Sequence, residues 1–244
     1  MLDANLGRKP SFFSYYMGEK FSDLEQVAIP GVLSTPRFGT FLTARNNNIL
    51  KALQLYHWNA QISAAFLFPL HVFEIAIRNA VANAAASFYR TDEWPWSIAF
   101  ETSLPTTRSA RKFSPRRELI GTRDWHSRPE QTTGKVISEL KFAFWVSMYT
   151  GRHDGRLWNA YLRREYPNIP PDLSVTQGRD NIHLTADKVR DLRNRIAHHE
   201  PIFSRDLKTE YDEIANVVGY RCQHTAAWMK RTQDVTWLLQ LLPT

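Results

Sequence analysis

The sequence has little cysteine and no long uninterrupted apolar run. Its single cysteine, Cys222, excludes an internal disulfide and favours a reducing compartment. Residues 1–18 lack the basic start, continuous apolar segment and small-residue cleavage site of a secretory signal. The longest apolar region, residues 62–88, is interrupted by side chains such as His71 and Glu74, which argues against a membrane span. We therefore expect a cytoplasmic protein with no membrane partner.

Strand-like alternation and fixed-period repeats are also missing, whereas helical periodicity dominates. In residues 69–89, apolar side chains recur at steps of three and four from Leu70 to Phe88, which stacks them into one stripe that faces the core. Beside this stripe Glu74 and Arg78 have the i,i+4 spacing of an ion pair. The pattern predicts an all-α fold.

The 244 residues suit one helical domain, residues 46–244, preceded by an N-terminal extension, residues 1–45, that contains a loop rich in proline and glycine. We predict separate helices over residues 47–66 and 69–89. After these comes an irregular basic insertion over about residues 91–129, which contains four prolines. Further helices are expected over residues 131–149, 156–165, 185–199 and 206–231, with a short apolar piece over residues 235–242.

A formal net charge of +7 favours polyanionic partners such as nucleic acid, although modestly basic proteins without such a partner are common. The basic insertion interleaves cations with Phe113 and Trp125, which suits RNA through phosphate neutralisation and base stacking. A solvated basic loop explains the same pattern equally well. The candidate RNA-binding cations are Arg108, Arg111, Lys112, Arg116, Arg117 and Arg123.

The stretch LRNRIAHHEP, residues 192–201, ends the predicted helix that begins at an N-cap on Thr185. On a helical wheel Val189, Leu192 and Ile196 form one buried stripe. His198 lies about 150° from the middle of that stripe and points away from the core, whereas His199 lies near its edge.

Arg193 lies on the opposite flank, so it approaches His198 only at a deformed helix end. Cationic histidines are also stabilised by the free carbonyls of a helix C-terminus, so an ordinary helix end stays an alternative. A metal site that uses His198 and His199 with His183 or His153 is disfavoured, because adjacent histidines diverge and no ligand spacing supports it. We expect no metal and no cofactor.

The segment LRNRIAHHEPIF resembles the signature of the Abi-like (AbiD/AbiF-type abortive infection) branch of the HEPN superfamily, in which Arg193, Asn194 and His198 match an Arg-x4-His motif. Residues 56–81, with Glu74 and Arg78, resemble the first helical block of that family, and residues 142–145 resemble its middle block. The resemblance covers about residues 55–203. No tyrosine follows two residues after His198, so the variant regulated by nucleotidylation of such a tyrosine is not supported.

This resemblance implies a HEPN-like helical bundle and a metal-independent endoribonuclease of the toxin or phage-defence type. Its expected partners are an RNA substrate, a second copy in a homodimer whose motif-bearing helix ends line a shared cleft, and an antitoxin that is either RNA or protein. The alternative is a non-catalytic HEPN module that binds RNA or a partner protein.

The resemblance also implies the roles of individual residues. The RNA 2′-hydroxyl attacks the adjacent phosphate, with His198 as general acid or base and Arg193 stabilising the developing charge. Asn194 orients His198 or holds the phosphate. Glu74 or Arg78 is expected to position the motif helix from the neighbouring helix, and Arg195 and His199 are the further supporting candidates.

Overall fold

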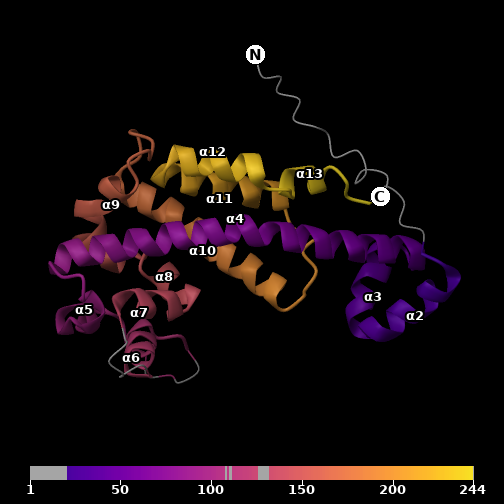
Figure 1. Ribbon diagram of the computed structural model, residues 1–244, viewed down its shortest axis with the longest axis horizontal. Helices are drawn as coiled ribbons and strands as arrows, with labels where there is room; N and C mark the ends of the chain where they lie inside the picture. Colours follow the sequence, from indigo (N-terminus) through magenta and orange to yellow (C-terminus); the bar gives the residue numbers. More distant parts are fainter. Residues whose placement is uncertain (1–20, 108, 110–111, 126–131, 244) are drawn as a thin grey trace, which may run out of the picture.

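The computed structural model describes residues 21–107, 109, 112–125 and 132–243, and every regular element in these residues is helical (Figure 1). This confirms the predicted all-α class. The α-helices are α2 (Asp23–Leu33), α3 (Thr35–Ala44), α4 (Ile49–Tyr89), α5 (Ile98–Ser103), α6 (Pro115–Trp125), α7 (Thr133–Glu139), α8 (Phe142–Ser147), α9 (Asn159–Glu165), α10 (Val175–Ala197), α11 (Leu207–Arg221), α12 (Gln223–Thr232) and α13 (Val235–Leu239). Short helical turns are η1 (Trp94–Trp96), η2 (Gly151–His153) and η3 (Asp154–Trp158).

Helix α4 runs along the length of the molecule, with α11, α12 and α13 above it and α8 and α10 below it in Figure 1. It begins where the Asn48 side chain accepts a hydrogen bond from the Lys51 N–H (3.0 Å). Along the helix, side chains such as Trp58, Phe66 and Phe73 are buried in the single described core cluster. The other helices therefore pack around α4 as a central axis.

The prediction of separate helices before and after Pro69 was wrong, because α4 continues through this residue. Proline lacks the N–H that would bond the Ala65 carbonyl, and a mid-helix proline costs about 3 kcal/mol or more. Apolar residues on both sides of Pro69, such as Phe66 and Leu70, are buried in the same core. Burial of both halves in one core offsets that cost.

By length and composition α4 is also the one described helix that could cross a membrane, with a mean hydropathy of 1.6 in its most apolar window. Its contacts are those of a core helix, because α3, α8, α10, α11 and α13 all pack against it.

The described part of the predicted N-terminal extension is helical, which corrects the expectation of a loop there. Pro30 and Gly31 lie inside α2, and α3 buries Phe38 and Phe41 against α4. The Phe41 ring lies 5.1 Å from the Tyr56 ring and 5.3 Å from the Phe203 ring, measured between centroids. Helix α3 thus ties α4 to the loop that follows α10.

The basic insertion is also more regular than predicted, since its described part contains α5 and α6. Pro115 is the first residue of α6, where its missing N–H costs nothing, so this proline starts a helix and does not break one. Two predicted helices are divided in the structure: residues 131–149 at Leu140 and Lys141, and residues 206–231 at the extended Cys222 (φ −156°).

We predict that Phe41→Ala lowers the free energy of unfolding by about 3–5 kcal/mol, because it leaves a cavity among Tyr56, Phe203 and the α3 backbone. Urea denaturation measures this change. The matched control, Thr40→Ala, alters an exposed side chain on the same helix and should change stability by less than about 0.5 kcal/mol. Equal stability of the two variants would contradict the packing of α3 on the bundle.

Candidate functional site

Helix α10 carries the Arg-x4-His motif at its C-terminal end. It begins at Val175, ten residues before the predicted N-cap Thr185, which is buried in the middle of the helix. The true N-cap is Ser174: its N–H donates to the Gln177 side chain (2.9 Å), and its hydroxyl accepts from the Gln177 N–H (3.2 Å). The predicted buried stripe is confirmed, with Val189, Leu192 and Ile196 exposed by 9% or less.

Arg193 is held by two other segments of the chain. Its Nε lies 3.4 Å from Glu74 Oε2 on α4, and its guanidinium carbon lies 5.9 Å from the centre of the Phe142 ring on α8. The Arg193 side chain stays 46% exposed, so part of the guanidinium faces solvent. The structure thus brings together Glu74, Phe142 and Arg193. Each comes from a different one of the three segments that resemble blocks of the HEPN family.

Glu74 pairs with Arg193 and not with Arg78, so the i,i+4 ion pair predicted on α4 is not formed. Arg78 Nε is buried and has no hydrogen-bond partner among the described residues. Local spacing indicated only the i,i+4 pair, whereas the resemblance implied that Glu74 or Arg78 positions the motif helix, and Glu74 is the one that contacts it.

His198 is the C-cap residue of α10, and its N–H donates to the Asn194 carbonyl (2.9 Å). Both side chains are exposed, and neither makes a hydrogen bond or ion pair with any residue that the structure describes. The position of His198 on the polar side agrees with the helical wheel. Its imidazole is therefore accessible to a ligand.

His199 does not lie near the core, which corrects its expected position. It is exposed and left-handed (φ 56°), just beyond the helix. The Glu200 N–H donates to the Arg195 carbonyl (2.8 Å) and the His199 N–H to the Ile196 carbonyl (3.1 Å), a Schellman motif in which glycine is the usual residue at this position. The chain therefore reverses directly after His198 at some cost in backbone strain.

Arg195 lies in a network that holds the end of α10. Its Nε is 3.5 Å from Asp191 Oδ2 and its Nη1 is 3.4 Å from Glu200 Oε2. The hydrogen bond from Arg205 is the main cause that lowers the pKa of the Asp191 carboxyl, and Arg205 also binds Glu210 (2.9 Å). The network crosses the loop after α10, so sequence spacing could not reveal it.

The basic residues of the insertion divide into two groups. Arg116 and Arg123 both bind Glu101 (3.0 and 2.9 Å), and the Arg116 and Arg123 guanidinium groups lower the pKa of this carboxyl. The ammonium of Lys112 is exposed and without a partner in the described chain, and Arg117 donates to the Lys112 carbonyl (2.7 Å). Arg108 and Arg111 lie outside the described residues.

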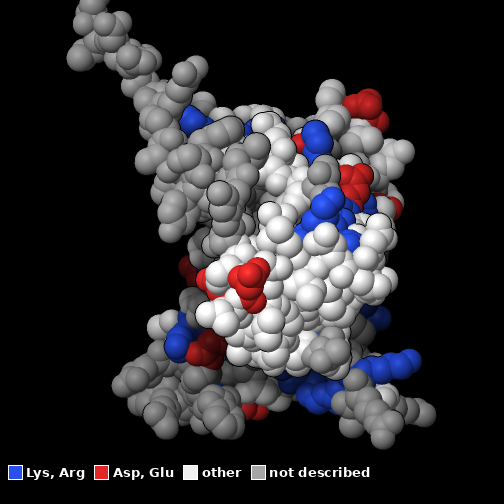
Figure 2. Space-filling view, turned by 90° about the vertical axis from the view of Figure 1, so that its right-hand side faces the viewer, with Lys and Arg blue, Asp and Glu red and all other residues white. Residues whose placement is uncertain are grey.

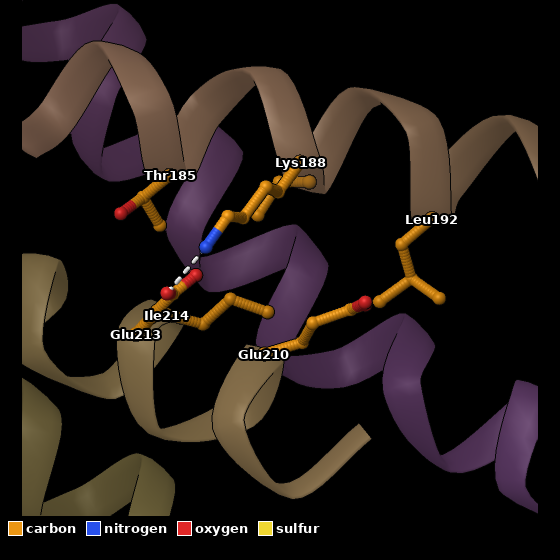
Figure 3. A pocket seen from close by; sticks show the side chains of 7 residues that line it. Thr185, Lys188, Leu192, Glu210, Glu213 and Ile214 are labelled. Carbon is orange, nitrogen blue, oxygen red and sulfur yellow. Dashed lines mark hydrogen bonds and ion pairs between the residues drawn. The ribbon is translucent and has the colours of Figure 1, made fainter. Parts of the chain in front are cut away.

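A crevice between α10 and α11 lies along the sides of these helices and away from the motif end (Figure 3). Lys188 bridges it by an ion pair with Glu213 (2.5 Å), above the apolar side chains of Leu192 and Ile214. Within the described residues, no group of three or more histidine, cysteine, aspartate or glutamate side chains is placed to hold a metal ion.

His153, which was considered as a metal ligand, is buried with its Nε2 unpartnered among the described residues. Burial, with a contribution from the charges of Arg152 and Arg156, lowers its pKa from 6.5 to about 4. The folded chain therefore keeps this imidazole neutral at pH values where the unfolded chain protonates it.

Because the unfolded histidine takes up its proton first, folding stability should fall as the pH drops from about 6.5 to about 4, by up to about 3 kcal/mol from this group. We predict that His153→Gln loses less stability than the parent between about pH 7 and pH 4.5, measured by urea denaturation. The exposed His224→Gln serves as the control and should follow the parent. A His153→Gln curve parallel to the parent would contradict the neutral buried imidazole.

We predict that His199→Gly raises the free energy of unfolding by about 1 kcal/mol, because glycine adopts a positive φ without steric strain. His199→Val should lower it by a similar amount, since a β-branched side chain tolerates this conformation poorly. Thermal or urea denaturation compares them with His198→Gly, a control at φ −92° where no strain is relieved. Similar stability of the glycine and valine variants at position 199 would show that the turn is not strained.

Comparison of the chain with protein-family models, with curated proteins and with solved structures gives no match. We therefore infer the function from the geometry around Arg193 and His198.

Proposed function

We propose that the protein is a HEPN-like, metal-independent endoribonuclease of the toxin or phage-defence type, acting in the cytoplasm as a homodimer. The observation that carries the proposal is the convergence of Glu74, Phe142 and Arg193 on the helix end that also carries the accessible imidazole of His198. An arginine fixed by a carboxylate and an aromatic ring has lost part of its rotamer freedom before a ligand arrives. This supports a role in binding a phosphate.

The proposed reaction is attack of an RNA 2′-hydroxyl on the adjacent phosphorus, with departure of the 5′-oxygen of the next nucleotide. A base removes the proton from the 2′-hydroxyl, and an acid gives a proton to the leaving oxygen. His198 supplies the imidazole for one of these transfers, and Arg193 stabilises the charge on the non-bridging oxygens. The products are a 2′,3′-cyclic phosphate and a 5′-hydroxyl end.

A homodimer suits this chemistry because one imidazole cannot remove a proton and donate another in the same step. A second copy of His198 across a shared cleft would supply the missing acid or base. In each chain the backbone turns directly after His198, and the imidazole has no intramolecular partner among the described residues. Both features are compatible with this arrangement.

Helix α6 provides a route for the RNA backbone toward the motif. Glu118 on α6 binds the Lys141 ammonium (2.9 Å), directly before Phe142, so the basic insertion packs next to the ring that holds Arg193. Lys112 and the 41% exposed ring of Phe113 offer a cation and a stacking surface. Arg116 and Arg123 contribute less, because Glu101 already balances their charge.

We predict that the purified chain cuts RNA in excess chelator, and that His198→Ala lowers the rate by about 10²–10⁴-fold. Arg193→Ala should lower it by about 10²–10³-fold, since a main source of charge stabilisation is lost. Glu74→Gln should lower it less, because it only loosens Arg193. Gel analysis of a labelled RNA measures these rates, and a 2′-deoxy nucleotide at the cleavage site should block cutting there.

The matched control is Arg190→Ala, which removes an exposed arginine of the same helix that pairs with Asp187 (2.7 Å) and should leave the rate unchanged. If the His198→Ala and Arg193→Ala variants cut RNA at the same rate as the parent, the cutting comes from a contaminating nuclease and the proposal is wrong. Salt-sensitive RNA binding without cleavage would favour the non-catalytic module, and Lys112→Ala should then weaken binding.

A further inference from the structure

Helix α2 carries apolar side chains on two opposite faces. The inner face packs Ile29 and Leu33 against the core, whereas the outer face presents Leu24, Val27 and Val32 to solvent. These three side chains are 83%, 79% and 85% exposed, the highest values among the large apolar residues of the described chain. Exposed apolar side chains that gather on one face of a helix mark a candidate interaction site.

The surface around this helix is poor in charge. No charged residue occurs from residue 26 to residue 36, although the exposed Glu25 lies on the same helix. Figure 2, which looks onto this end of the molecule, shows a broad area with few charged side chains, interrupted by acidic atoms. Charged groups lie around that area, which is the pattern of an apolar interface with a polar rim. We call Leu24, Val27, Ala28 and Val32 the α2 surface.

We propose that the α2 surface binds the same surface of a second copy of this chain, with the two α2 helices antiparallel about a two-fold axis. Asp23 begins α2, and Arg37 lies just beyond its C-terminal end. Both are exposed, and neither has an ion-pair partner in the described part of the chain. An antiparallel pair places each Asp23 next to the Arg37 of the partner subunit.

This charge arrangement is what identifies the occupant. A two-fold interface must be complementary to itself, so it needs an apolar centre and opposite charges at its two ends. Helix α2 and the start of α3 contain both features within fifteen residues, from Asp23 to Arg37. An unrelated protein partner would not require opposite charges at the two ends of the apolar surface.

Docking through α2 would also connect the two candidate sites. Helix α3 packs Phe41 on Phe203, in the loop that follows the motif, so each α2 surface is joined to its motif end through α3. The inference rests on the proposed function in one respect: it names the surface through which the proposed homodimer forms. Dimerisation through α2 does not require RNA cleavage.

The contact is small, because an eleven-residue helix is only about 16 Å long. We therefore expect a dissociation constant in the micromolar range, about 1–100 µM. Sedimentation equilibrium of the full chain over about 1–200 µM should detect a reversible monomer–dimer equilibrium.

Val27→Glu combined with Val32→Glu should raise the dissociation constant by at least about a hundredfold, since it buries unpaired like charges at the centre of the contact. Ile98→Glu is the matched control, because Ile98 is 78% exposed on α5, away from this surface. Asp23→Arg and Arg37→Asp should each weaken the dimer, and the two together should restore it. Circular dichroism melting verifies that all variants fold.

Two results together would support the proposal. The Val27→Glu/Val32→Glu variant loses the dimer whereas Ile98→Glu keeps it, and the Asp23→Arg/Arg37→Asp double variant dimerises although each single variant is weakened. A parent chain that stays monomeric at every concentration would overturn it, as would a dimer insensitive to these changes or equally sensitive to Ile98→Glu. Failure of the charge swap to restore association would overturn the antiparallel arrangement. A dimer that does not cut RNA contradicts only the ribonuclease proposal. A monomer that cuts RNA contradicts this proposal and the homodimer of the proposed function, but not RNA cleavage itself.

Discussion

Burial of α4 along its whole length is the constraint on which the rest of the molecule depends. Apolar residues before and after Pro69 enter the same core, and polar side chains on the same helix fix the surrounding segments. Asn59 accepts a hydrogen bond from the Ile202 N–H (2.8 Å) in the loop after the motif, Glu74 holds Arg193, and Asn83 donates to Glu165 (3.0 Å) at the end of α9. A shift of α4 would therefore disturb both the core and the motif end.

The motif end is fixed from two sides, whereas the side chains of Asn194 and His198 have no partner among the described residues. On one side Glu74 and Phe142 restrict Arg193, and on the other the ion pairs of Asp191, Arg195 and Arg205 hold the last turn of α10. The left-handed His199 then turns the chain away directly after His198. Strain at such a position persists only where surrounding contacts stabilise it, and strained residues are concentrated at functional sites.

Much of the fold could be predicted from the sequence, because helical periodicity is a local signal. The all-α class and the buried stripe of α10 follow from it, and so does the outward position of His198. The continuity of α4 could not be predicted, since local propensity places a break at Pro69 and only tertiary burial outweighs it. Local spacing pairs Glu74 with Arg78 for a similar reason, because Arg193 becomes its neighbour only when α4 and α10 pack together. Only the family resemblance linked Glu74 to the motif helix.

We propose that Arg193 and His198 together form the centre that binds and cleaves RNA. A crystal structure of the full chain with a short RNA that carries 2′-deoxy nucleotides, and is therefore not cut, tests this proposal. We expect a backbone phosphate within hydrogen-bond distance of the Arg193 guanidinium, with the His198 imidazole next to the 2′ position or the leaving oxygen of that phosphate. RNA bound away from both side chains, with no phosphate next to Arg193, would contradict the proposal.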